Sequence, residues 1–152
     1  MPLFPNNHAD NNAANYTYLS LVLPILALIA PIVLFPLEKV LPYPHILEEL
    51  TKAFLVFLIL AIPGKFFQIK LAVFIGFFFA FSENFFYLSS FIETENLTSF
   101  IQRFFLTGFF HILTMLIILI SAQKYRYLIF PALLLAMLLH YTYNQNIPLL
   151  FH

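Results

Sequence analysis

The sequence has no cysteine among its 152 residues, and charged residues make up only 9% of it. The absence of cysteine excludes disulfides, a thiol nucleophile and a thiolate metal site. Soluble proteins carry roughly 25% charged residues, and the seven basic and seven acidic residues here leave no surplus of positive charge. A basic nucleic-acid-binding surface is therefore excluded.

Hydrophobic residues make up 62% of the chain. A water-soluble globule of this length cannot bury that much apolar surface, and disordered chains are poor in such residues. The composition therefore predicts an integral membrane protein in contact with lipid.

A helix needs roughly 20 mostly apolar residues to cross the hydrocarbon layer. Five stretches come close to or reach this length, at residues 18–37, 46–62, 69–88, 100–120 and 127–143. We expect an all-α fold, a polytopic membrane helix bundle of about five transmembrane helices. It divides into a polar N-terminal segment (1–17), the bundle (18–144) and a short C-terminal tail (145–152).

The positively charged residues indicate an orientation, because Lys and Arg in short loops are retained in the cytoplasm. With five spans, four cations fall on the side of the N-terminus and two on the opposite side. These are Lys65, Lys70, Lys124 and Arg126 against Lys39 and Arg103. The count predicts that the N-terminus lies inside.

Several ionisable or amide side chains lie within the predicted spans, where each charge costs roughly 2.5 to 3.5 kcal/mol at the bilayer centre. They are Glu48, Glu49, Lys52, Glu83, Asn84, Arg103, His111, His140 and Asn144. Taken singly, they have ordinary explanations: acids at a helix start, polar contacts between helices, or cations that reach the headgroups. Successive spans cross the membrane in opposite directions, and this alternation brings all of these side chains into the same half of the membrane. By the count of Lys and Arg residues, this is the outer half. This common depth on four helices favours a single functional site.

Such a group of carboxylates, histidines and an asparagine suits hydrolysis. A buried carboxylate can take a proton from water, a histidine can share it, and His or Asn donors can stabilise an oxyanion. The Gly-x-Ser-x-Gly and His-Glu-x-x-His motifs are both absent, which argues against a serine nucleophile and excludes a standard zincin site. A zinc ion held by His111, His140 and one glutamate remains a chemical alternative.

Four motifs follow one another on successive spans: Glu-Glu-x-x-Lys at residues 48–52, Phe-x-x-x-Glu-Asn at 79–84, a single His111, and His-x-x-x-Asn at 140–144. In this order they resemble the PrsW family of intramembrane proteases, which is related to the CAAX prenyl endopeptidases and ABI proteins. The resemblance covers about residues 46–144. It implies a multi-pass endopeptidase that cuts membrane-anchored proteins in a bacterial or archaeal cytoplasmic membrane.

The resemblance also implies roles for single residues. Glu48 is the favoured general base with Glu49 as its partner, while His140 and Asn144 supply the oxyanion donors. The expected partners are membrane lipid and a membrane-anchored protein substrate, with no nucleic acid.

One position departs from the CAAX pattern, because Glu83 stands where those enzymes have a histidine. The proton partner of Glu48 is then either Glu83 or His111. The residues favour a mechanism that depends on glutamate without a cofactor, although zinc stays open as a metal.

Two other functions fit the same residues. One is a non-catalytic scaffold, since a branch of this superfamily is a subunit of gamma-secretase. The other is a small transporter with a proton-coupled carboxylate, for which a polar tunnel open on both sides is expected.

Overall fold

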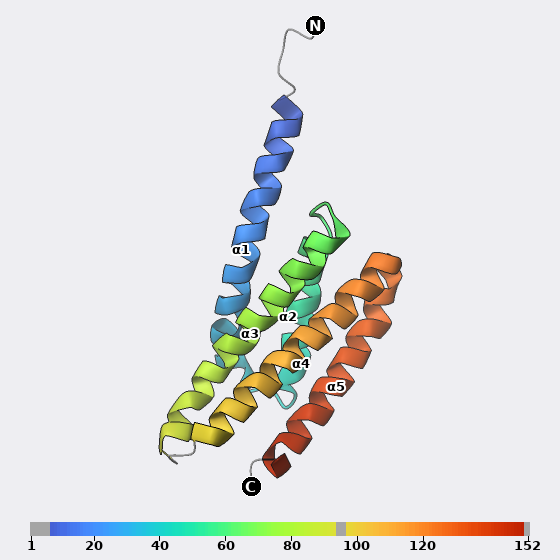
Figure 1. Cartoon of the computed structure of the whole chain (residues 1–152). Helices are drawn as coiled ribbons and strands as arrows, with labels where there is room; N and C mark the ends of the chain where they lie inside the picture. The colour runs from blue at the N-terminus through green and yellow to red at the C-terminus, as the bar shows by residue number, and fades with distance from the viewer. Residues whose placement is uncertain (1–6, 94–96, 151–152) are drawn as a thin grey trace, which may run out of the picture.

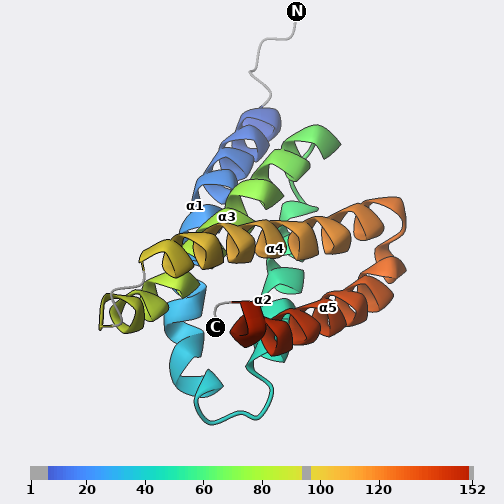
Figure 2. The ribbon, with the colours of Figure 1, turned by 60° about the horizontal axis from the view of Figure 1, so that its bottom comes forward.

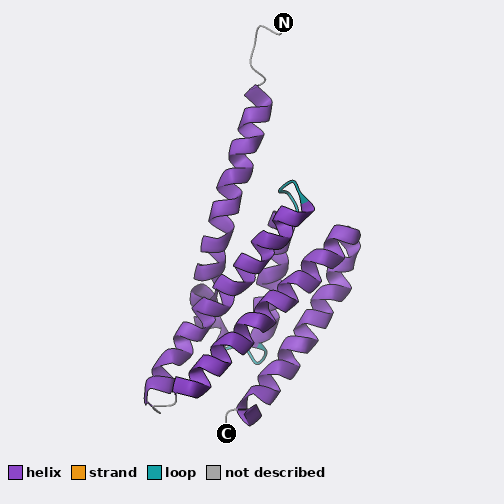
Figure 3. Ribbon diagram, in the orientation of Figure 1, coloured by secondary structure: helices purple, strands orange, loops and turns teal. Residues whose placement is uncertain are grey.

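The structure is a computed structural model that describes the backbone of residues 7–93 and 97–150 and the side chains of residues 15–86, 88 and 97–146. Within these ranges the chain is helical, with short turns and no strand (Figure 3). The helices are α1 (Asn7–Glu38), α2 (Pro44–Ile59), α3 (Lys65–Glu93), α4 (Leu97–Lys124), the 3₁₀ turn η1 (Arg126–Leu128) and α5 (Ile129–Leu150). The predicted all-α bundle is confirmed.

Successive helices run in opposite directions (Figure 1). The end of α1, the start of α2, the end of α3, the start of α4 and the end of α5 therefore lie at one end of the bundle. The shorter α2 contacts each of the other four α-helices and lies behind α4 (Figures 1 and 2). Helix α1 packs against α2 and α3.

Proline and glycine mark the turns on either side of α2. Pro44 is the first residue of that helix, where its fixed φ suits the first turn and its missing N–H costs no helical hydrogen bond. Gly64 has a φ of +92° in the turn that leads to α3, a conformation that favours glycine.

Four helical segments are long and apolar enough to cross a membrane: Asn15–Glu38, Lys65–Phe86, Leu97–Lys124 and Arg126–Asn146. The chain is therefore an integral membrane protein. The helix at the second predicted span, α2, has 16 residues. At 1.5 Å per residue its length is about 24 Å, which is shorter than expected. Helix α2 is thus below the length of a simple span, and its contacts with four neighbours embed it in the bundle.

Helices continue past both predicted ends of the bundle. The N-terminal segment 1–17 is already helical from Asn7 onward, and α5 continues to Leu150, beyond the predicted start of the tail. Residues 1–6 and 151–152 of these two segments lie outside the described residues.

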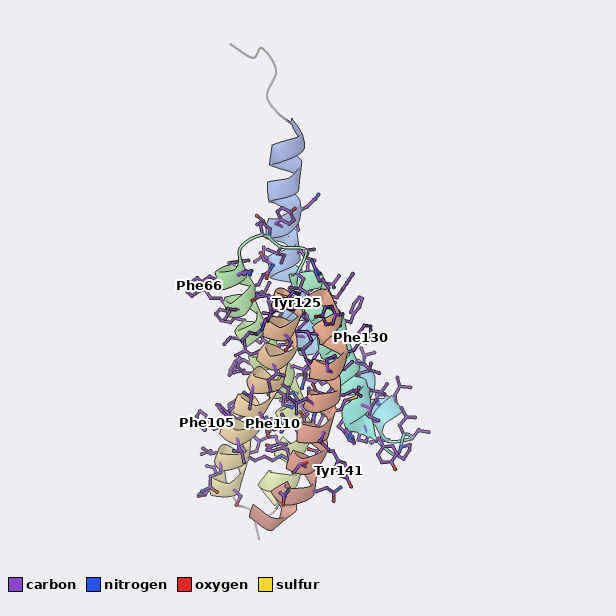
Figure 4. The ribbon with its side chains drawn as sticks, turned by 90° about the vertical axis from the view of Figure 1, so that its right-hand side faces the viewer. Phe66, Phe105, Phe110, Tyr125, Phe130 and Tyr141 are labelled. Atoms are coloured by element: carbon purple, nitrogen blue, oxygen red, sulfur yellow. The ribbon has the colours of Figure 1, made fainter. Side chains whose placement is uncertain are left out.

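Large aromatic side chains cover the outside of the bundle. Phe66, Phe105 and Phe130 are 71%, 70% and 70% exposed and point away from the helices (Figure 4). Several phenylalanines of α3 are likewise exposed, whereas Phe79 is fully buried.

The apolar core occupies the half of the bundle away from the start of α2. It contains Leu55, Val56 and Ile59 of α2 together with apolar residues of α3 and α4. Helices α3 and α4 approach closely at Gly76, where a Cβ would lie 2.9 Å from the Cα of Ile112. Small residues allow such backbone approach in membrane bundles. Here the approach places α3 directly against the backbone of α4 at His111 and Ile112.

Candidate active site

The glutamates and histidines singled out in the sequence meet at the end of the bundle where α2 begins. Glu49 and His111 are fully buried, and Glu48 and His140 are 6% and 1% exposed. They come from α2, α4 and α5, and Glu83 joins them from α3. The shared depth deduced from the spans thus corresponds to direct contacts in the folded chain.

Glu49 is held by two side chains through one carboxylate oxygen. Its Oε1 lies 2.6 Å from Nζ of Lys52 and 2.8 Å from Nδ1 of His140. Lys52 is fully buried and donates a second hydrogen bond to Oγ1 of Thr114 at 3.1 Å. Instead of bridging both glutamates of the Glu-Glu pair, the ammonium group therefore bonds to Glu49 and to α4.

The second histidine forms its own contact with an acid. Nε2 of His111 lies 2.7 Å from Oε2 of Glu83, although neither atom makes a hydrogen bond of good geometry with the described residues. The ring of Phe79 stacks on the imidazole of His111 with centroids 5.4 Å apart. One face of this imidazole is thus covered by an aromatic ring, Nε2 faces Glu83, and Nδ1 has no hydrogen-bond partner among the described residues.

Three potential metal ligands converge between these two pairs. Each of Glu48, His111 and His140 offers one ligand atom, and the three atoms all lie within 4.8 Å of one another. Nε2 of His140 is 3.7 Å from Oε2 of Glu48, and the imidazole rings of His111 and His140 meet edge to face at 5.3 Å. Two imidazoles and a carboxylate form a donor set that catalytic zinc sites use.

A cavity of about 390 Å³ opens beside this cluster. Glu48 and Glu83 lie in its wall, as do Arg103 and Asn144, and the end of α1 contributes to the same wall. The complete lining consists of Pro31, Phe35, Glu38, Lys39, Pro44, Glu48, Glu83, Phe86, Arg103 and Asn144. Its wall therefore combines acidic, basic and apolar groups at one end of the bundle.

The two asparagines differ in position. Asn144 lines the cavity beside Glu48 and Glu83, as its spacing from His140 suggests. Asn84 is buried, donates to its own helix at the carbonyl of Ala80 (2.8 Å) and does not line the cavity. Only Asn144 is therefore placed to contact a molecule in the cavity.

Of the hydroxyl side chains near the cluster, Thr114 and Tyr143 were not anticipated from the sequence, whereas the spacing of Thr107 places it on one face of its span with His111. Thr114 contacts Lys52 and also donates to the backbone carbonyl of His111 at 3.2 Å. Thr107 shares a hydrogen bond of 2.7 Å with the hydroxyl of Tyr143, which stacks on Phe110. Their spacings of three or four residues from His111 and His140 are a weak signal, because threonine and tyrosine are common in membrane helices without a role.

A family model described as PrsW family intramembrane metalloprotease matches residues 44–151. The matched part contains every residue of the cluster and leaves out the whole of α1. No curated protein and no solved structure matches the chain.

Proposed function

Because the chain belongs to the PrsW family of intramembrane metalloproteases, we propose that it hydrolyses a peptide bond in membrane-anchored protein substrates at the cluster described above. The observation that carries this proposal is the convergence of Glu48, His111 and His140, with ligand atoms within 4.8 Å of one another. The cluster adjoins the cavity, which gives an extended segment of substrate access to it.

The residues fit a divalent metal such as zinc. Oε2 of Glu48 and Nδ1 of His111 are buried without a hydrogen-bond partner among the described residues, which is costly unless another group binds them. Nδ1 of His140 contacts Glu49. Histidines that bind a metal through one ring nitrogen usually hydrogen-bond to a carboxylate or carbonyl through the other. Glu48, His111 and His140 are thus the proposed ligands.

When bound, the metal would supply Lewis acidity towards water and the peptide carbonyl. Glu83 is the proposed general base, because it lines the cavity and its side chain, at 15% exposed, is the more accessible of the two cavity-lining glutamates of the cluster. Its carboxylate accepts the proton of the attacking water and passes it to the leaving amine. Asn144 can donate a hydrogen bond to the oxyanion from the cavity wall.

A metal-free version of the same reaction is supported by the two contacts between an acid and an imidazole. Glu48 would then act as the base with His140 at 3.7 Å, and His111 would share a proton with Glu83 at 2.7 Å. Here His140 and Asn144 both serve as oxyanion donors. The two versions differ in whether zinc is needed.

The cavity bears on the transporter alternative. All of its lining residues come from one end of the bundle, whereas the other half contains the apolar core. A cavity at one end fits a protease, which needs a single access side.

The test is cleavage of a panel of single-span membrane reporters by the full-length protein in lipid vesicles. We expect Glu48→Gln, Glu83→Gln and His140→Ala to abolish cleavage and Thr51→Val to retain it. Thr51 is a matched control, since its hydroxyl bonds to Leu47 of its own helix. Full activity in all three site variants would contradict a catalytic role and favour the scaffold alternative.

Metal dependence is tested on the same preparation. Treatment with a strong chelator should abolish cleavage, and added zinc should restore it. Activity that persists after removal of all divalent metal, as checked by elemental analysis, supports the metal-free version instead.

A further inference from the structure

Lys52 lies in a place where a charge is expensive. It is fully buried, and an isolated ammonium group in such a place would be strongly destabilising. Its surroundings offset this cost: Oε1 of Glu49 at 2.6 Å, Oγ1 of Thr114 at 3.1 Å, and the ring of Phe79 with its centroid 5.4 Å away. Three helices therefore meet around one cation.

The ammonium group determines how Glu49 meets His140. Nζ of Lys52 can only donate hydrogen bonds, so Oε1 of Glu49 acts as an acceptor towards it at 2.6 Å. Nδ1 of His140, 2.8 Å from the same oxygen, must then carry a proton and donate it. In the neutral imidazole this leaves the lone pair on Nε2, the atom that lies 3.7 Å from Glu48.

Thr114 connects this arrangement to the other histidine. Its hydroxyl donates to the backbone carbonyl of His111 at 3.2 Å and accepts from Lys52 at 3.1 Å. A hydroxyl has one proton to donate. The Thr114 hydroxyl therefore donates to the carbonyl and accepts from Lys52, and these two directions cannot be exchanged. A continuous chain of hydrogen bonds thus runs from the backbone of His111 through Thr114, Lys52 and Glu49 to His140.

We propose that Lys52 and Thr114 are positioning residues, which fix the tautomer of His140 and its distance from His111. Neither residue lines the cavity, so both act through Glu49 and the imidazoles. This inference rests on the proposed function, since it explains how the two histidines are held ready for a metal. Loss of such outer partners typically lowers metal affinity or activity by about 10- to 100-fold.

The experiment uses the full-length protein in detergent micelles and compares Thr114→Val, Thr114→Ser, Lys52→Met and the control Thr51→Val. Thr114→Val keeps the shape of the side chain but removes the hydroxyl, whereas Thr114→Ser keeps the hydroxyl. Zinc affinity is measured by competition with a chelator, using zinc alone as the probe. Nitrogen NMR of isotope-labelled histidine side chains reports the tautomer, with the His140 signal assigned by its absence in His140→Gln.

We expect Nδ1 of His140 to be protonated in the unmodified protein and in Thr114→Ser. Thr114→Val should weaken zinc binding by about 10-fold, at the lower end of the range for outer-shell partners, and Lys52→Met should weaken it further and give a mixture of tautomers. Thr51→Val should match the unmodified protein in both measurements.

The outcomes separate the two proposals. If Thr114→Val leaves both zinc affinity and the His140 signal unchanged, the positioning role is wrong, whatever the protease does. If the unmodified protein binds no zinc, the metal-dependent function is wrong, and the tautomer comparison still decides the role of Thr114. Should Lys52→Met fail to fold, the two Thr114 variants carry the test alone.

Discussion

Glu48 and Glu83 reach the same cavity but have different neighbours. Glu48 lies with both histidines in the set of convergent ligand atoms, whereas Glu83 contacts His111 and has the more exposed carboxylate. At the scale of single residues, this difference is the basis for proposing Glu48 as a metal ligand and Glu83 as the base.

The different roles proposed for Glu48 and Glu83 predict different effects of the same substitution on zinc binding. Glu83→Gln should lower kcat by about 10²- to 10⁴-fold, the usual contribution of a general base, and leave zinc binding nearly unchanged. Glu48→Gln should lose zinc as well as activity. Parallel measurement of kcat and zinc content in both variants checks this, and loss of zinc in Glu83→Gln alone would reverse the two roles.

The sequence predicts which residues meet at this site but not how they pair. Helical spacing places Glu48, Glu49 and Lys52 on one face, and alternation of the spans gives their depth. Whether Lys52 bonds to one glutamate or both depends on the rotation of α2 against α4, which no spacing specifies. Thr114 and Phe79 escape prediction for the same reason, since only packing brings them to Lys52 and His111.

At the scale of helices, the distance between α3 and α4 depends on Gly76. A Cβ at this position would lie 2.9 Å from the Cα of Ile112 and 3.1 Å from the carbonyl oxygen of His111, so the two backbones must move apart to admit it. Gly108 is the matched control, because a Cβ there meets no atom within 4 Å.

We therefore expect Gly76→Ala to lower the free energy of unfolding by about 1 to 3 kcal/mol, the usual cost of overpacking. It should also reduce activity, since His111 moves with α4. Gly108→Ala should cause no loss of stability. Thermal or SDS-induced unfolding of the purified protein measures both effects, and equal stability of the two variants would argue against close packing at Gly76.

Helix lengths were predicted less well than helix number. Hydropathy identifies the apolar part of a helix but gives little information beyond the membrane, so the extension of α1 back to Asn7 was missed. The end of α2 at Ile59 reflects the turn that leads to Gly64, whereas the apolar residues continue to Ile62. Apolarity alone therefore made the second span too long.

At the scale of the whole molecule, the absence of cysteine makes the orientation directly measurable. Val40 lies beyond α1 at the cavity end and is 83% exposed, and Tyr125 lies beyond α4 and is 53% exposed. With the N-terminus inside, Val40→Cys should react with a membrane-impermeant thiol reagent added outside intact cells. Tyr125→Cys should react only after the membrane is opened. The reverse pattern would contradict the orientation taken from the Lys and Arg count, and reaction of both from one side would contradict the alternating crossings.

The cavity wall formed by α1 has no counterpart in the sequence prediction. Helix α1 is apolar on most sides, so its sequence does not indicate which face packs against α3. Its end nevertheless places Glu38 and Lys39 in the cavity wall, together with residues that the family model covers.

None of the side chains in the path from His111 to His140 belongs to α1. The end of α1 thus lines the cavity but contributes no side chain to this path, so replacement of α1 tests whether the first helix affects what the cavity admits. A chimera that carries a foreign first helix should retain the zinc affinity of the parent while accepting a different range of polypeptides.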